Sequence, residues 1–167
     1  MKSKKEKVKF IVFNAILAAL YIGLTYLTYP VSYGDLGIEL RVSEVLVLLC
    51  FFNKKFILGL TVGCLLGNLF GPMGIVDAIF GTSATLISCY LITKSKNLFI
   101  ASLFPVIING IVVGVELWFL YEMPLYIGFL SVAIGEFIVV SIVGCLLFKT
   151  LKNNKSFNDI FSENNLD

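Results

Sequence analysis

The apolar residues of this chain form long runs separated by short polar segments, rather than the alternating pattern of half-buried strands. One run, Phe56–Thr93, is too long for a single membrane helix and is interrupted at Gly71–Gly74, which predicts a turn between two spans. The other runs are Phe10–Thr28, Val42–Phe52, Leu98–Leu120 and Leu125–Leu151. Together they predict an all-α membrane protein with six transmembrane helices over residues 10–151. A lysine-rich segment at residues 1–9 precedes them, and a polar tail at residues 152–167, which we expect to be frayed or disordered, follows.

The short run Val42–Phe52 has only about half of the roughly 20 residues that a helix needs to cross a bilayer. The positions of the lysines decide whether it crosses, because positive residues in short loops stay in the cytoplasm. With six crossings, every lysine cluster lies on one side. The clusters are the N-terminal lysines, Lys54–Lys55, Lys94 with Lys96, and Lys149 with Lys152 and Lys155. We therefore predict a short span here, and a multi-pass protein of the cell membrane with both termini in the cytoplasm.

The composition agrees with a bilayer protein and excludes several classes of function. The chain is 58% hydrophobic and 14% charged, with a mean hydropathy of +0.94, which leaves too little polar surface for a water-soluble globule. Histidine is absent, and the four cysteines lie in apolar runs without CxxC spacing. The sequence has no GxSxG motif around Ser83 and no P-loop. We predict no enzyme activity, no cofactor, no metal site and no nucleic acid partner.

Ionisable side chains inside the predicted spans are costly and need an explanation. They are Arg41, Glu44, Asp77, Glu116 and Glu136, and the amides Asn68 and Asn109 share their predicted depth. Arg41 and Glu44 are three residues apart and could simply neutralise one another on a helix surface. No second basic residue is available for Glu116 and Glu136. An acid without a fixed partner suggests a ligand that supplies one.

Two aromatic segments could belong to the same site. The connection from Tyr29 to Glu39, which includes Tyr33, is predicted to be a structured flap that closes over it. Trp118 and Tyr126 lie near the predicted outer boundary of the membrane, where aromatic residues are common in any membrane protein. They could form such a belt, or they could stack on a planar ligand.

Small residues spaced four apart allow membrane helices to pack closely. Such stripes are Gly59 with Gly63 and Gly67, Ala15 with Ala19 and Gly23, and Gly110 with Gly114. Most should pack inside the bundle, and one could instead face an external partner.

Several short segments resemble one family of membrane proteins. They are Pro30–Gly34, Glu39–Glu44, Gly67–Phe70, Asp77–Thr82, Asn109–Gly110, Gly114–Leu117 and Gly135–Glu136, together with Ala15 and Ala19 in the first helix. In this order, between about Ala15 and Leu147, they resemble the QueT family of substrate-binding (S) components of energy-coupling factor (ECF) transporters.

The resemblance implies capture, from outside the cell, of a queuosine precursor or related 7-deazaguanine (preQ1, preQ0 or queuine). Uptake would then be driven by a separate transmembrane coupling subunit with two cytoplasmic ATPase subunits, docked through Ala15 and Ala19. For such a ligand, Glu116 or Glu136 would accept from the N–H edge, Asn109 and Arg41 would orient the polar groups, and Trp118 or Tyr126 would stack. Glu44, Asn68 and Asp77 complete the predicted site. Two alternatives stay open: an S component for another planar vitamin, such as a flavin or biotin, and an assembly protein without a small ligand whose buried acids pair with a partner chain.

Overall fold

A computed structural model describes residues 4–28 and 38–161 of the chain. The described residues are helical, with no strand among them. The elements are α1 (Lys4–Leu27), η1 (Val42–Leu48), α3 (Leu49–Phe52), η2 (Lys54–Phe56), α4 (Ile57–Leu69), α5 (Ile75–Ile92), α6 (Leu98–Tyr121), α7 (Leu125–Glu136), η3 (Phe137–Gly144), α8 (Cys145–Leu151) and α9 (Lys155–Phe161). The predicted all-α fold is confirmed.

Four helical segments of the described chain are long and apolar enough to cross a membrane. They are Lys4–Leu27, Ile75–Ile92, Leu98–Tyr121 and the continuous run Leu125–Leu151, which is formed by α7, η3 and α8. Two further segments are shorter. Val42–Phe52 has the 3-10 turns of η1 followed by α3, and α4 has 13 residues. These four helices make the chain a multi-pass membrane protein, whereas the predicted count of six crossings stays a prediction.

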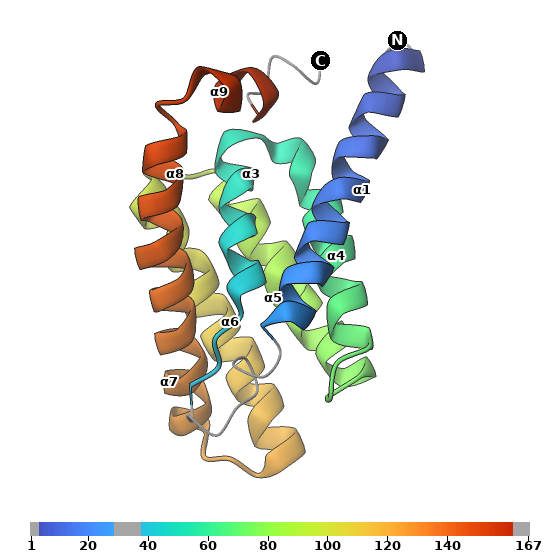
Figure 1. The fold of residues 1–167 in the computed structure, drawn as a ribbon. Helices are drawn as coiled ribbons and strands as arrows, with labels where there is room; N and C mark the ends of the chain where they lie inside the picture. The colour runs from blue at the N-terminus through green and yellow to red at the C-terminus, as the bar shows by residue number, and fades with distance from the viewer. Residues whose placement is uncertain (1–3, 29–37, 162–167) are drawn as a thin grey trace.

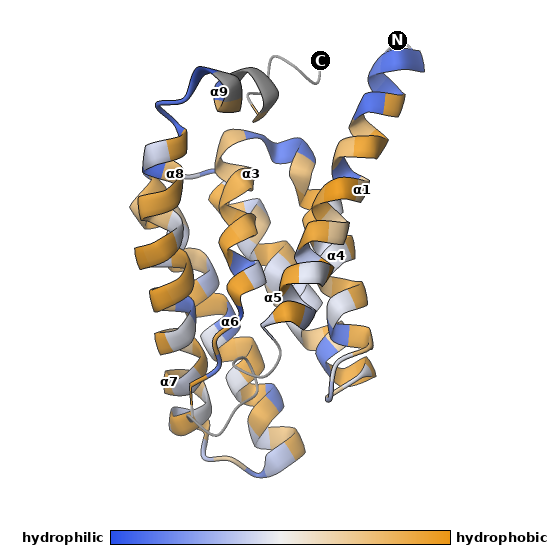
Figure 2. Cartoon of the chain, viewed as in Figure 1, coloured by the Kyte–Doolittle hydropathy of each residue, from blue (hydrophilic) through white to orange (hydrophobic). Residues whose placement is uncertain are grey.

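Successive segments run in alternating directions along one bundle, so the start of α1 and the α9 helix lie at the same end (Figure 1). Figure 2 shows that hydrophilic residues gather at this end, at the start of α1, between α3 and α4, and between α8 and α9. The bodies of the helices between the two ends are predominantly apolar. We call this end the lysine end, because it carries Lys54, Lys94 and Lys149 as well as the first turns of α1.

Helices α1 and α4 pack through the glycine stripe of α4. A Cβ atom added to Gly59 would lie 2.5 Å from the carbonyl oxygen of Asn14, and one added to Gly63 would lie 2.8 Å from Cβ of Tyr21. The Asn14 side chain also accepts a hydrogen bond of 2.7 Å from the Gly59 N–H. Only glycine permits so close an approach, and this stripe therefore packs inside the bundle.

The other stripes differ in their surroundings. Gly114 packs against Gly128 and Phe129 of α7, so that stripe is also internal. Ala15, Ala19 and Gly23 are exposed on the face of α1 that points away from α4, and a Cβ at Gly23 would meet no atom within 4 Å. Within the described residues, this stripe is the one that internal packing does not use.

The short segment Val42–Phe52 lies in the middle of the bundle. Val47, Leu48 and Cys50 are at most 1% exposed, and they belong to a cluster with residues from α1, α4, α5 and α8. Helices around it shield this segment from lipid. Its position brings the residues at its start, Arg41 to Glu44, into the interior.

Helical structure extends beyond the apolar runs at both ends of the described chain. α1 begins at Lys4 and so includes Lys5, Lys7 and Lys9, which precede the apolar run at Phe10. The expectation of a disordered tail is wrong for Lys155–Phe161, which forms α9. Phe157 is buried and its ring lies 5.4 Å from that of Phe52, while Phe161 lies 5.7 Å from Phe56. The average polarity of the tail concealed these two aromatic residues, which lie one helical turn apart and face the bundle.

Candidate functional site

Arg41 joins three elements in the half of the bundle opposite the lysine end. Its Nη2 atom donates to Asp77 Oδ2 at 3.1 Å and to Oδ1 at 3.2 Å, in the first turn of α5. Its Nε atom donates to Glu39 Oε1 at 2.5 Å. Its Nη1 atom lies 3.4 Å from Asn68 Oδ1, near the end of α4. All four side chains are buried, so Arg41 draws the start of η1, α4 and α5 together.

This arrangement does not show the simple neutralisation of Arg41 by Glu44 that their spacing allowed. The ion pairs of Arg41 in the described chain are with Glu39 and Asp77. Glu44 instead accepts hydrogen bonds through Oε1 from the hydroxyl of Tyr21 and, at 3.2 Å, from that of Thr85. Its Oε2 atom is buried and has no hydrogen-bond partner among the described residues.

Gly81 makes room for the Arg41 cluster. A Cβ atom at this position would lie 2.4 Å from Asp77 Oδ1 and 2.6 Å from Asn68 Nδ2. Gly81 was not among the predicted site residues. The available signal was its spacing, because Gly81 follows Asp77 by one helical turn and thus shares its face of α5.

Tyr21 and Thr85 were also missed. Both lie in apolar helices, where a hydroxyl gives little signal in the sequence. Cys64, which donates to Thr85 Oγ1 at 3.3 Å and accepts from Asn68 Nδ2 at 3.4 Å, connects the surroundings of Glu44 to those of Arg41.

A second group of polar side chains lies on α6 and α7. Asn109 donates from Nδ2 to Glu136 Oε1 at 2.8 Å. Asn109 Oδ1 and Glu136 Oε2 are buried without a partner among the described residues. Glu116 is fully buried, and neither of its carboxylate oxygens has such a partner. Buried carboxylates are normally hydrogen-bonded, so Glu116 is the feature of this site that most needs an explanation.

The balance of buried charge is strongly acidic. Within the described residues, the buried ionisable side chains with formal charge at neutral pH are Arg41 and five acids, Glu39, Glu44, Asp77, Glu116 and Glu136. The two polar groups belong to one region, because Glu39, which pairs with Arg41, packs its backbone against Gly135, the neighbour of Glu136 in the chain. One cation cannot balance five acids.

Glu39 lies before η1, outside the helical segments. Burial raises the pKa of its carboxyl group above the ordinary value, and the guanidinium of Arg41 opposes this shift only in part. The backbone at Glu39 also approaches α7 very closely, because a Cβ at Gly135 would overlap the Glu39 carbonyl oxygen. Gly135 therefore permits the segment before η1 to pass directly beside Glu136.

Four of the predicted residues, Trp118, Tyr126, Ala15 and Ala19, lie outside this buried region. Trp118 and Tyr126 are 51% and 68% exposed, a position that favours the aromatic-belt interpretation over stacking on a buried ligand. Tyr29 and Tyr33 lie outside the described residues, so a flap stays a prediction. Ala15 and Ala19 lie on the exposed face of α1, away from the polar groups.

The region offers hydrogen-bond acceptors in excess. Carboxylate oxygens of Glu116, Glu136 and Glu44 and the amide oxygen of Asn109 have no donor from the described chain. A small polar molecule that carries several N–H groups, or a positive charge, would satisfy them. The described residues contain no group of three or more histidine, cysteine or acidic side chains arranged to hold a metal ion.

Comparison with known proteins gives a consistent result. A family model described as "QueT transporter" matches residues 11–153. The curated "Queuosine precursor transporter QueT" of Lactococcus lactis subsp. cremoris (strain MG1363) is 36% identical over 152 residues, which covers 80% of this chain and 87% of the relative. No solved structure shows a significant match.

Proposed function

This chain belongs to the QueT transporter family, and from that premise we propose that it binds a 7-deazaguanine precursor of queuosine for import. In this proposal it is the S component of an ECF transporter, and it captures the ligand from outside the cell. The observation that carries the proposal is Glu116, a fully buried carboxylate with no donor from the described residues. A binding protein has a physical reason to keep such a group unsatisfied until its ligand arrives.

The chemistry of a 7-deazaguanine suits the acceptors of this region. Its guanine-like edge presents adjacent N–H donors, which a carboxylate can accept in a pair. We assign that edge to Glu116, with the open oxygens of Glu136 and Asn109 as further acceptors. Arg41 would face the ligand carbonyl. A 7-aminomethyl group, which is cationic at neutral pH, would in addition offset the excess of buried acid.

We also propose the orientation of the chain in the membrane. The lysine clusters at one end of the bundle support a cytoplasmic location for that end and for both termini. Arg41, Asp77 and Glu116 then lie toward the outside, where a ligand arrives. In this topology Val42–Phe52 and α4 each cross the membrane as a short segment. The helices packed around them would separate these short segments from lipid.

Transport requires an energy source, and the exposed stripe Ala15, Ala19 and Gly23 supports docking to a coupling subunit. Its small side chains would permit close approach of a partner helix. In the ECF scheme this partner is the transmembrane coupling subunit, which two cytoplasmic ATPases drive. Docking on α1 would leave the glycine stripe of α4 undisturbed.

The test is thermal unfolding of the detergent-purified chain with a panel of compounds. The panel contains queuine, its 7-aminomethyl and 7-cyano precursors, guanine, riboflavin and biotin. A ligand that binds only the folded state raises the unfolding temperature in a concentration-dependent way. We expect a rise with a 7-deazaguanine. A rise only with riboflavin or biotin would reassign the cargo, and no rise with any compound would favour an assembly protein without a small ligand.

A further inference from the structure

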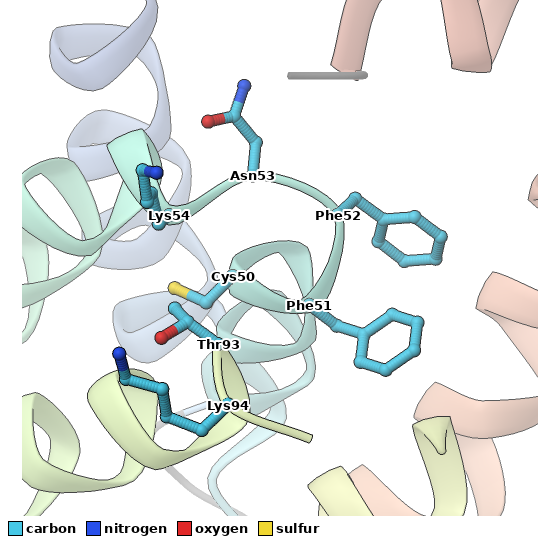
Figure 3. A pocket seen from close by; sticks show the side chains of 7 residues that line it. All are labelled: Cys50, Phe51, Phe52, Asn53, Lys54, Thr93 and Lys94. Atoms are coloured by element: carbon cyan, nitrogen blue, oxygen red, sulfur yellow. The ribbon is translucent and has the colours of Figure 1, made fainter. Parts of the chain in front are cut away.

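Among the described residues, two clefts lie at the lysine end of the bundle, and the proposed ligand site uses neither of them. The larger, of about 340 Å³, lies between the end of α3, the α5–α6 connection and α8. The smaller, of about 230 Å³, lies beside the same end of α3. Figure 3 shows the smaller one, with Lys54 and Lys94 on one side of the turn and the rings of Phe51 and Phe52 pointing to the other. These two rings line both clefts.

The larger cleft is strongly positive. Lys96, Lys149 and Lys152 line it, all three are exposed, and no described residue in its lining is acidic. Lys149 and Lys152 are three residues apart, on one face at the end of α8 and just beyond it. The cleft also includes the first residues of α6, whose N-terminal end adds a partial positive charge. Three lysines and a long helix therefore direct positive charge into one concave surface.

The same cleft has an apolar wall. Phe51, Phe52 and Phe99 line it, and Phe99 is 47% exposed. A free phosphate ion would leave this wall in contact with solvent. A phospholipid satisfies both parts, because its phosphate can lie among the lysines while its acyl chains lie against the aromatic rings and the apolar helices.

We propose that this cleft is a binding site for an anionic phospholipid, with the headgroup phosphate held by Lys96, Lys149 and Lys152. Basic pockets between membrane helices recognise phosphate-bearing headgroups in this way. Lysines that only set the orientation of a membrane protein need no shared cleft. The lipid would occupy the leaflet at the lysine end and join α3, α6 and α8 from outside the bundle. The proposal does not depend on the identity of the transported ligand.

The experiment uses the full chain, delipidated in detergent and titrated with phosphatidylglycerol or with phosphatidylcholine of the same acyl chains. Bound lipid is followed by native mass spectrometry, and the unfolding temperature is measured in parallel. We expect phosphatidylglycerol to bind more tightly and to raise the unfolding temperature more than phosphatidylcholine does. Equal effects of the two lipids would overturn the proposal. An equal rise with inorganic phosphate would overturn it too, since the cleft would then recognise a free anion.

A matched pair of variants tests the location. The K149Q/K152Q variant should bind phosphatidylglycerol about tenfold more weakly or worse, because each lysine near an anionic headgroup contributes favourably. The K4Q/K5Q variant makes the same change in net charge at the start of α1, where both lysines are exposed, and should bind as the unaltered chain does. An equal loss of phosphatidylglycerol affinity in both variants would show that the lipid responds to the overall charge of this end, and it would exclude this cleft as the binding site.

Discussion

Arg41 and Asp77 lie 36 residues apart in the sequence and form a buried ion pair, with Arg41 Nη2 within 3.2 Å of both carboxylate oxygens. The pair connects the start of η1 to the first turn of α5 and positions the backbone from Glu39 onward beside α7. Neighbouring Glu116 has no comparable partner among the described residues. Two buried acids that look alike in the sequence thus differ in role. Asp77 is paired with Arg41, whereas Glu116 has no hydrogen-bond donor among the described residues.

The first prediction follows from this pair. The D77A variant should lose about 3 kcal/mol of unfolding free energy, because it leaves the buried guanidinium of Arg41 with less compensation. Thermal and denaturant unfolding in detergent measure the change. The E122A variant is the control, since Glu122 is exposed at the end of α6. If D77A unfolds as the unaltered chain does, the ion pair is not structural.

The second prediction separates binding from stability at Glu116. The E116Q variant should bind 7-aminomethyl-7-deazaguanine at least about tenfold more weakly, as expected for the loss of a hydrogen bond to a charged group. Its unfolding temperature without ligand should not fall, because no described donor satisfies the carboxylate. Isothermal titration calorimetry and thermal unfolding provide the two measurements, and E122Q is the matched control. Unchanged binding by E116Q would remove Glu116 from the ligand site.

The third prediction concerns the exposed face of α1. The A15L/A19L variant should bind ligand normally and unfold at the usual temperature, yet abolish uptake by cells that contain the complete transporter. The A18L variant is the contrast, since Ala18 packs against Gly63 of α4 and a larger side chain there should destabilise the bundle by about 1–3 kcal/mol. Normal uptake by A15L/A19L would exclude this face as the docking surface.

The fourth prediction is a pH dependence at Glu39. Burial raises the pKa of this carboxyl group, so the folded chain binds the proton more tightly than the unfolded chain does. Its stabilising contribution is complete below the unfolded pKa and is lost as the pH rises through the raised folded pKa. The unfolding free energy of the E39Q variant should therefore fall less than that of the unaltered chain as the pH rises through this range. Unfolding at a series of pH values measures the difference. Parallel profiles for E39Q and the unaltered chain would contradict the assignment.

Hydropathy and charge in the sequence predicted the helical class and the burial of the ionisable residues, because both depend on the cost of polar groups in lipid. The break at Gly71–Gly74 was predicted from the length of the apolar run and from its turn residues. The QueT resemblance is likewise confirmed. The partners of the buried acids could not be predicted. Arg41 forms an ion pair with Asp77 rather than with Glu44, which is only three residues away in the sequence, because η1 packs against α5. Only the tertiary packing of these two helices determines this pairing. The exposure of Trp118 did leave a signal, because Trp118 follows Glu116 by two residues and therefore lies on the opposite side of α6 from that buried acid.

The fifth prediction compares two glycines that helix propensity treats alike. At Gly81 an added methyl group would lie 2.4 Å from Asp77 Oδ1, so G81A must displace the Arg41 cluster. We expect it to lose about 1–3 kcal/mol of unfolding free energy and to weaken ligand binding. At Gly23 the added methyl group meets no atom within 4 Å, and G23A should be about 0.5–1 kcal/mol more stable because alanine favours the helix. Unfolding and ligand titration of the two variants side by side test the cluster directly. A G81A variant as stable as G23A would show that the space at Gly81 is not needed, and the Arg41 cluster would then lose its role in shaping the site.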